Sequence, residues 1–412
     1  MSNKRKIIND PVHGFIAIPS GLHYDIIQHP FFQRLSRIRQ LGLIYTVYPG
    51  ALHTRFQHSL GAMHLMSEAI NQLRLKGNEI TSEEAEAALA AILLHDIGHA
   101  PFSHALENAI TEGISHEEIS LLIMQIINRE MNGKLDMALE IFQNKYPKHF
   151  LHQLVSSQLD MDRLDYLIRD SFFTGVVEGA VGTARIIKML NVHNDQLVVE
   201  AKGIYSIEKF LIARRIMFWQ VYSHKTCVAA EQMLVNALRR AKELAMSGEE
   251  LFASPSLHYF LYNKVDKERF ISDEKAFQHY ASFDDSDIVS VLKVWALHPD
   301  KVLSVLSKSL VDRKLFKTEI LEYPVEEQIY QKQIEEYSKV FGISEHEASY
   351  LLSQNSISVN TYTPKDDNIN ILYNDGTVRD IAEASDILDI SMLSKQVKKY
   401  YFCWMKTITK NQ

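Results

Sequence analysis

The stretch ILLHDIGHAPFSH, residues 92–104, is the part of the sequence from which fold and function are best inferred. It places His95 directly before Asp96 at the end of an apolar run. Imidazole and carboxylate groups are both ligands for Zn, Fe, Mn or Ni. An isolated pair of this kind is more often a structural contact than a metal site, so the interpretation depends on whether other segments complete a ligand set.

Two other segments contain candidate ligands. HTRFQHSLGAMH, residues 53–64, offers His53 and His58. LDMDRLDYLIRD, residues 159–170, offers four aspartates, which are Asp160, Asp162, Asp165 and Asp170. Helical bundles build metal sites from side chains on facing helices. We therefore predict a site of two imidazoles and two carboxylates, namely His58, His95, Asp96 and Asp162.

Capping signals and hydrophobic periodicity place these segments on helices. A capping box, TSEE at residues 81–84, opens the strong helix formers EAEAALAAILL, and Gly98 with Pro101 supplies the stop. Because residues four apart share a helical face, His99 is expected close to His95. Further helical patterns cover residues 117–127, residues 161–170 and the long stretch from Tyr205 to about Met246.

Strand patterns gather at the two ends of the chain. KIINDPVHGFIAI, residues 6–18, predicts two short strands around a Pro/Gly turn, and LVVE at 197–200 is β-like. Beyond about Leu310, KLFKTEILEY and SISVN predict strands, NINILYNDGTV predicts a hairpin, and we expect a final helix around Lys395 to Met405. The predicted parts are an N-terminal hairpin and helices (1–50), a helical core (51–310) and an α+β appendage (311–412).

Composition indicates an ordinary soluble protein. Hydrophobic residues make up 46% and charged residues 23% of the 412 residues, both near the averages for globular proteins. Two cysteines, Cys227 and Cys403, are too few for a disulfide framework, which favours the cytoplasm. Neither a signal peptide nor a membrane span is expected. The net charge of −7 argues against a broad nucleic-acid-binding surface, and a local basic groove stays open as an alternative.

Together these motifs resemble the HD-domain metal-dependent phosphohydrolases. The resemblance is closest to the bacterial group similar to deoxynucleoside triphosphate triphosphohydrolases, to which a vertebrate enzyme with a SAM domain is related. It runs in order from about residue 6 to about residue 236 and includes FQRLSRIRQLG (32–42), KGIYSIEKFLIAR (202–214) and QVYSHKT (220–226). It implies a mainly α fold, an HD-domain helical bundle with a short N-terminal β-hairpin and a small C-terminal α+β region. The family's metal ligands fall on the four residues predicted above.

The resemblance also implies roles around the metal. His99, His104 and His116 match histidines near the scissile phosphate, and which of them donates a proton stays open. Glu107 matches a carboxylate that orients one of these histidines. The phosphate-binding positions of the family fall on Arg55, Arg163 and Arg214. The positions that surround the deoxyribose fall on Gln40, Tyr166, Asp170, Tyr222 and His224.

The implied activity is hydrolysis of a deoxynucleoside triphosphate to deoxynucleoside and triphosphate. It requires one divalent transition metal ion (Fe, Mn, Zn or Ni), and Mg could accompany the substrate phosphates. A homo-oligomer, dimer or tetramer, is expected. The same signature serves enzymes acting on nucleoside monophosphates or cyclic nucleotides, and a non-catalytic nucleotide-sensing protein is a third alternative. The family's regulatory nucleotide site is only partly matched, because Gln28, Ser36 and Gly182 replace charged groups, so guanine-nucleotide activation is not expected.

Overall fold

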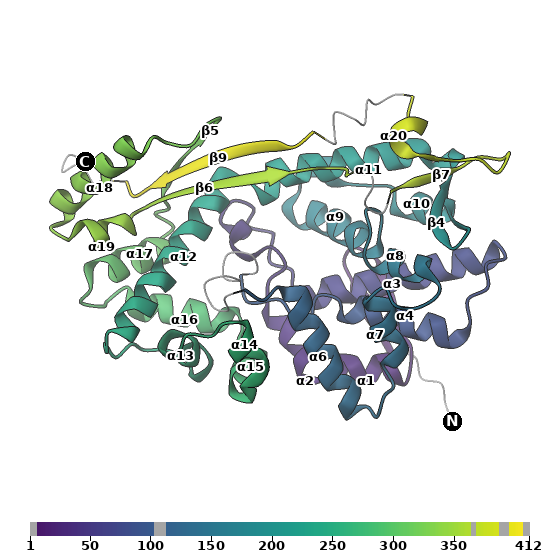
Figure 1. Ribbon diagram of the computed structural model, residues 1–412, viewed down its shortest axis with the longest axis horizontal. Coiled ribbons are helices and arrows are strands. Elements are labelled where there is room, and N and C mark those ends of the chain that lie inside the picture. The colour runs from purple at the N-terminus through teal and green to yellow at the C-terminus, as the bar shows by residue number, and fades with distance from the viewer. Residues whose placement is uncertain (1–5, 103–112, 364–367, 387–394, 407–412) are drawn as a thin grey trace.

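The computed structural model describes residues 6–102, 113–363, 368–386 and 395–406 (Figure 1). Helices dominate. Their bounds are α1 Leu22–Gln28, α2 Pro30–Arg34, α3 Arg55–Leu75, α4 Ser82–Leu94, α6 His116–Glu130, α7 Asp136–Phe142, α8 His149–Val155, α9 Met161–Thr174, α10 Thr183–Met189, α11 Ile204–Met217, α12 Lys225–Met246, α13 Pro255–Tyr262, α14 Lys267–Ser272, α15 Glu274–Ser282, α16 Asp285–Trp295, α17 Lys301–Val311, α18 Glu327–Phe341, α19 Glu345–Ser349 and α20 Ile381–Ala384.

The strands form three small sheets. Their bounds are β1 Lys6–Asp10, β2 Gly14–Ile18, β3 Leu190–His193, β4 Gln196–Glu200, β5 Lys317–Leu321, β6 Leu352–Val359, β7 Asn370–Leu372, β8 Val378–Asp380 and β9 Val397–Trp404. β1 and β2 pair as the predicted antiparallel hairpin. β4 pairs with β3 and, in parallel, with β7, whose other neighbour β8 completes the predicted second hairpin. β9 lies between β5 and β6.

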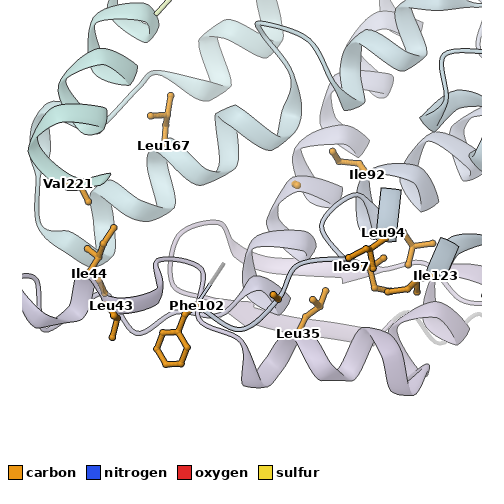
Figure 2. Packing of buried hydrophobic residues seen from close by; sticks show 14 of the residues in the cluster. Leu35, Leu43, Ile44, Ile92, Leu94, Ile97, Phe102, Ile123, Leu167 and Val221 are labelled. Atoms are coloured by element: carbon orange, nitrogen blue, oxygen red, sulfur yellow. The ribbon is translucent and has the colours of Figure 1, made fainter. Parts of the chain in front are cut away.

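The helices that carry the predicted ligands pack together, with α3 against both α4 and α9. α4 is apolar on nearly all sides, which is typical of a helix buried in a core, and its residues from Ala87 to Leu94 are buried. At its C-terminal end, Leu94 and Ile97 join Ile123 of α6 in the hydrophobic cluster (Figure 2). This packing fixes the position of the chain that follows α4.

The predicted capping box at the start of α4 is confirmed. The Thr81 hydroxyl accepts a hydrogen bond from the Glu84 backbone N–H, and the Glu84 carboxylate accepts one from the Thr81 N–H. The helix ends at Leu94, one turn before Gly98. The Ser120 hydroxyl of α6 then accepts a hydrogen bond from the Gly98 N–H and donates one to the His95 carbonyl, which holds the turn in place.

Two sequence predictions need correction. Residues 397–404 form strand β9 and not a helix, because the valine and aromatic residues of VKKYYFCW favour a strand and its backbone pairs with two neighbouring strands. The long helix expected from Tyr205 to Met246 is divided by a π-helical turn, Phe218–Tyr222, and by His224, whose extended backbone begins α12. The mainly α fold with an N-terminal hairpin and C-terminal strands is confirmed.

No helix within the described parts of the chain combines the length and the apolar character that crossing a bilayer requires.

Candidate metal centre

Three donor atoms converge where α3, α4 and α9 meet. They are Nε2 of His58 on α3, Nε2 of His95 just after α4, and Oδ1 of Asp162 in the first turn of α9, all within 4.8 Å of one another. The two nitrogens lie 3.4 Å apart, and Asp162 Oδ1 lies 3.0 Å from His58 Nε2 and 3.4 Å from His95 Nε2. Two imidazoles and a carboxylate at this spacing are a mixed ligand set for a transition metal.

Both histidines are oriented by hydrogen bonds at their other ring nitrogen. Nδ1 of His58 lies 2.8 Å from Oδ2 of Asp165, and Nδ1 of His95 lies 2.6 Å from the carbonyl oxygen of Ile92. A carbonyl or ionised carboxylate can only accept, so Nδ1 carries the proton in each ring. The lone pair of each Nε2 therefore faces the other ring, which is the arrangement found around protein-bound metals.

The charge of the site favours a cation between these atoms. Burial alone would lower the pKa of His58, but hydrogen bonds to Asp162 and Asp165 raise that pKa to about 10. Burial would raise the pKa of Asp162, but the two histidines hold it below its ordinary value. Two nitrogen lone pairs 3.4 Å apart beside a carboxylate need a proton or a metal ion between them, and the residues therefore fit a divalent ion.

Asp96, the fourth predicted ligand, lies beside these three donors. Its oxygens are 3.4 Å from His95 Nε2, 3.7 Å from His58 Nε2 and 3.3 Å from His99 Nε2. The Asp96 carboxylate is also ion-paired with the guanidinium of Arg55. The structure thus brings all four predicted ligands together, with Asp96 shared between the ligand set and Arg55.

The predicted catalytic histidines lie next to Asp96, although the reason given for His99 is wrong. α4 has ended before His99, so the turn at 95–98 and not a shared helical face brings it close. The His99 ring stacks on His116, the first residue of α6, with ring centroids 3.9 Å apart. Burial and the neighbouring Arg55 lower the pKa of His99 to about 3. His104 and Glu107 lie outside the described residues.

The predicted phosphate-binding arginines differ in how they are held. Arg55 is buried against Asp96. Arg163 donates from Nε to the Ser157 carbonyl at 2.6 Å and to Asp160 at 3.1 Å. Arg214 on α11 has a buried Nη1 with no hydrogen-bond partner among the described residues. A buried guanidinium nitrogen without a partner is costly, so an anionic group beside Arg214 would be stabilised by it.

Hydrogen bonds through His53 link three of the predicted sugar-binding residues, Gln40, Asp170 and Tyr222, and a ring contact adds Tyr166. Asp170 accepts from the Tyr222 hydroxyl at 2.7 Å and pairs with Nε2 of His53 at 2.8 Å. The Tyr166 ring meets the Tyr222 ring edge to face, with centroids 6.2 Å apart. Gln40 joins this region through its backbone N–H, which donates to the His53 carbonyl at 3.0 Å. The π-helical turn places Tyr222 in this contact.

His224 lies at the N-terminus of α12. Its Nδ1 accepts a hydrogen bond from the Thr226 N–H at 3.2 Å and caps the N-terminus of α12. Its ring meets Tyr48 edge to face. The structure shows this capping contact for His224, and a role at the sugar stays a prediction.

Two residues of the site have roles that the sequence does not predict. The sequence offers His53 only as a candidate ligand, whereas its side chain pairs with Asp170; its position five residues before His58 is the one signal for a place near the site. The sequence offers Asp165 only as an alternative ligand, whereas its carboxylate orients the His58 ring through Nδ1. Its spacing of three from Asp162 on one helix could have suggested that both carboxylates reach the same histidine.

Comparisons with known proteins agree with this geometry. A family model described as the HD domain matches residues 55–170, and one described as the HD associated region matches residues 181–254. The first match contains all four predicted ligands, since its bounds run from the start of α3 to the end of the LDMDRLDYLIRD segment.

Three similar proteins match this chain, two of them over nearly its whole length and one over 60% of it. The uncharacterised protein YwfO of Bacillus subtilis is 30% identical over 97% of this chain and 92% of its own length. A deoxynucleoside triphosphate triphosphohydrolase SAMHD1 homolog of Dictyostelium discoideum is 30% identical over 60% of this chain and 51% of its own length. The crystal structure of a phosphohydrolase from Bacteroides thetaiotaomicron is 60% identical, covers 98% of this chain and 100% of that chain, and has a TM-score of 0.95.

Proposed function

Because the chain belongs to the HD-domain phosphohydrolase family and is related to its SAMHD1-like group, we propose that it hydrolyses deoxynucleoside triphosphates to a deoxynucleoside and triphosphate. The convergence of His58, His95 and Asp162 beside Asp96 carries this proposal. A phosphate ester resists hydrolysis because its oxygens repel a nucleophile, so a site that gathers cations and proton carriers is what the reaction needs.

His58, His95, Asp96 and Asp162 would hold the metal ion. When bound, a divalent ion would polarise a phosphoryl oxygen and ease deprotonation of water. The ligand set suits Fe, Mn, Zn and Ni alike, and Mg could accompany the substrate phosphates. Asp96 would serve as a ligand through Oδ1, which lies 3.4 Å from His95 Nε2, while Oδ2 keeps its ion pair with Arg55 until a substrate phosphate competes for that arginine. Arg55 would then turn its charge toward a phosphate.

The remaining steps fall to the chain's own residues. Arg214, whose buried Nη1 has no partner among the described residues, would receive the phosphates together with Arg163. The low pKa of His99 keeps its ring neutral near neutral pH, so His99 would not carry the proton for the leaving oxygen and would act through hydrogen bonds. His116, stacked on His99, would be the partner that passes a proton to the leaving 5′ oxygen.

The deoxyribose would lie against the aromatic pair. The Tyr166 and Tyr222 rings meet edge to face, and the hydrogen bond from Tyr222 to Asp170 fixes one of them. A ring packed under C2′ would exclude a ribose hydroxyl, because a hydroxyl against an aromatic face would lose its hydrogen bonds with water. Discrimination of deoxynucleotides from ribonucleotides would follow. Assembly as a homo-oligomer and a cytoplasmic location stay predictions.

The test is product analysis with matched variants. Wild type, Asp96→Ala, Arg214→Gln and the control Arg215→Gln would be incubated with each dNTP, rNTP and nucleoside monophosphate plus Mn or Mg, and products separated by chromatography. We expect triphosphate and deoxynucleoside from dNTPs, loss of both with Asp96→Ala, a large loss with Arg214→Gln and little change with Arg215→Gln. Cleavage of monophosphates alone would contradict the proposed substrate.

A further inference from the structure

A buried ionic network extends from His58 to the N-terminal hairpin. The Asp165 carboxylate contacts Nδ1 of the His58 ring, whereas Nε2 of the same ring is one of the three converging donors. Its Oδ2 meets His58 Nδ1 at 2.8 Å, and its Oδ1 meets Nε2 of His13 at 2.6 Å. His13 belongs to the turn between β1 and β2. One carboxylate therefore joins a histidine of the metal centre to a histidine of the hairpin.

Arg169 connects the same carboxylate to a second residue of the hairpin. It donates to Asp165 from Nε at 2.8 Å and from Nη2 at 3.0 Å. It also donates to Asp10 from Nη1 at 2.7 Å and from Nη2 at 3.3 Å. Asp165 and Arg169 are fully buried and Asp10 is 4% exposed. Two bidentate contacts on one buried guanidinium allow little freedom of position.

The Asp10 carboxylate, which binds Arg169, also closes the hairpin turn. Its Oδ1 accepts hydrogen bonds from the backbone N–H groups of Val12 at 3.0 Å and His13 at 2.9 Å. Asp10 pairs across the hairpin with Gly14. Asp10 therefore both shapes the turn that places His13 beside Asp165 and binds Arg169. This explains the structural role of the NDPVHG segment.

The space for this network is made by a glycine. A Cβ added to Gly61 on α3 would lie 2.0 Å from Asp165 Oδ1 and 2.2 Å from Arg169 Nη2. These distances are far inside van der Waals contact. Helix α3, which carries His58, approaches α9 this closely only because residue 61 has no side chain.

We propose that Asp10 and His13 are positioning residues of the metal centre and that metal binding and docking of the β1–β2 hairpin stabilise each other. Fixing the His58 ring with Nδ1 protonated presents its Nε2 lone pair to the ion. Coupling between two sites is reciprocal, so a hairpin that favours the metal is itself held more firmly when the metal is bound. This inference rests on the metal site of the proposed function.

Metal affinity of the purified full chain tests the positioning. Co²⁺ would be titrated into metal-free wild type, Asp10→Asn, His13→Ala and His13→Gln, with binding followed by visible absorption and by competition with a chelator. Asn at position 10 retains an oxygen for the turn but no charge for Arg169. Gln at position 13 keeps an N–H donor for Asp165.

We expect Asp10→Asn and His13→Ala to weaken Co²⁺ binding about 10- to 100-fold, with His13→Gln restoring part of the loss. The control Asp25→Asn removes an exposed carboxylate from the neighbouring helix α1 and should leave binding unchanged. Far-UV circular dichroism of the metal-free variants shows whether each is folded. If Asp10→Asn does not fold, the comparison of His13→Ala with His13→Gln tests the inference.

Hydrogen exchange tests the reciprocal effect. Co²⁺ added to wild type should slow amide exchange of residues 6–18, and this protection should be smaller in His13→Ala. If wild type binds no Co²⁺, the proposed metal site itself is wrong. If wild type binds but the Asp10 and His13 variants bind within about twofold of it, or the hairpin amides do not respond, the inference is overturned.

Discussion

Replacing Gly61 with alanine should destabilise the protein, although alanine is the better helix former. In the middle of a helix such as α3, Gly→Ala alone would add about 1 kcal/mol of stability. Here the new Cβ would fall 2.0 Å from Asp165 Oδ1 and 2.2 Å from Arg169 Nη2, and neither fully buried side chain can retreat into solvent. Breaking a buried ion pair costs about 3–5 kcal/mol, so the net loss is about 2–4 kcal/mol.

Urea unfolding of the metal-free protein, followed by far-UV circular dichroism, measures this loss. The control Glu68→Gly changes an exposed residue of the same helix and should cost about 1 kcal/mol, which calibrates the contribution of helix propensity because its exposed contact with His64 at 3.6 Å contributes little. Gly61→Ala should also weaken Co²⁺ binding, because His58 loses its fixed partner. A Gly61→Ala protein as stable as wild type, or more stable, would refute the account of why α3 carries glycine at this position.

Three further predictions concern other parts of the chain. Thr81→Ala should lower stability by about 1 kcal/mol, measured by urea unfolding, because the Glu84 N–H loses its acceptor at 3.1 Å, whereas Ser82→Ala should be neutral. Burial raises the pKa of Glu231 from 4.5 to about 7. Between these pH values the unfolded chain ionises more readily than the folded one, so the folded state loses stability as pH rises. Glu231→Gln should therefore raise the melting temperature above pH 7 but not below pH 4.5. Tyr222→Phe should lower kcat/KM for dNTPs about 10-fold or more in steady-state assays without changing metal content, because Asp170 loses a hydrogen bond of 2.7 Å, and an unchanged value would remove Tyr222 from the site.

Local signals in the sequence were sufficient for the elements that depend on local interactions. The capping box joins Thr81 and Glu84, only three positions apart, and so a short segment of sequence is enough to predict where α4 begins. The hairpin at residues 6–18 follows from a turn between two short strands. The sequence pattern predicts a helix where strand β9 forms, although the valine and aromatic residues of this segment favour a strand. The pairing with β5 and β6, which lie far away in sequence, decides the structure there.

The candidate ligands could be predicted from residue type, whereas the residues that orient those ligands could not. Two histidines and two aspartates define a ligand set by residue type, and the structure brings His58, His95, Asp96 and Asp162 together. The network behind His58 was missed because Asp10 and Arg169 are 159 positions apart, and a buried carboxylate reveals its partner only in three dimensions. The break at Phe218–Tyr222 was missed because a π-helical turn lacks a strong sequence signature.

Anomalous diffraction from crystals of the metal-loaded protein, recorded at the absorption edge of the bound metal, tests the central claim most directly. The account predicts one strong peak about 2.0–2.2 Å from Nε2 of His58, Nε2 of His95 and Oδ1 of Asp162, with an oxygen of Asp96 as a further ligand. A peak elsewhere in the molecule, or none between these side chains, would contradict the assignment of the metal centre.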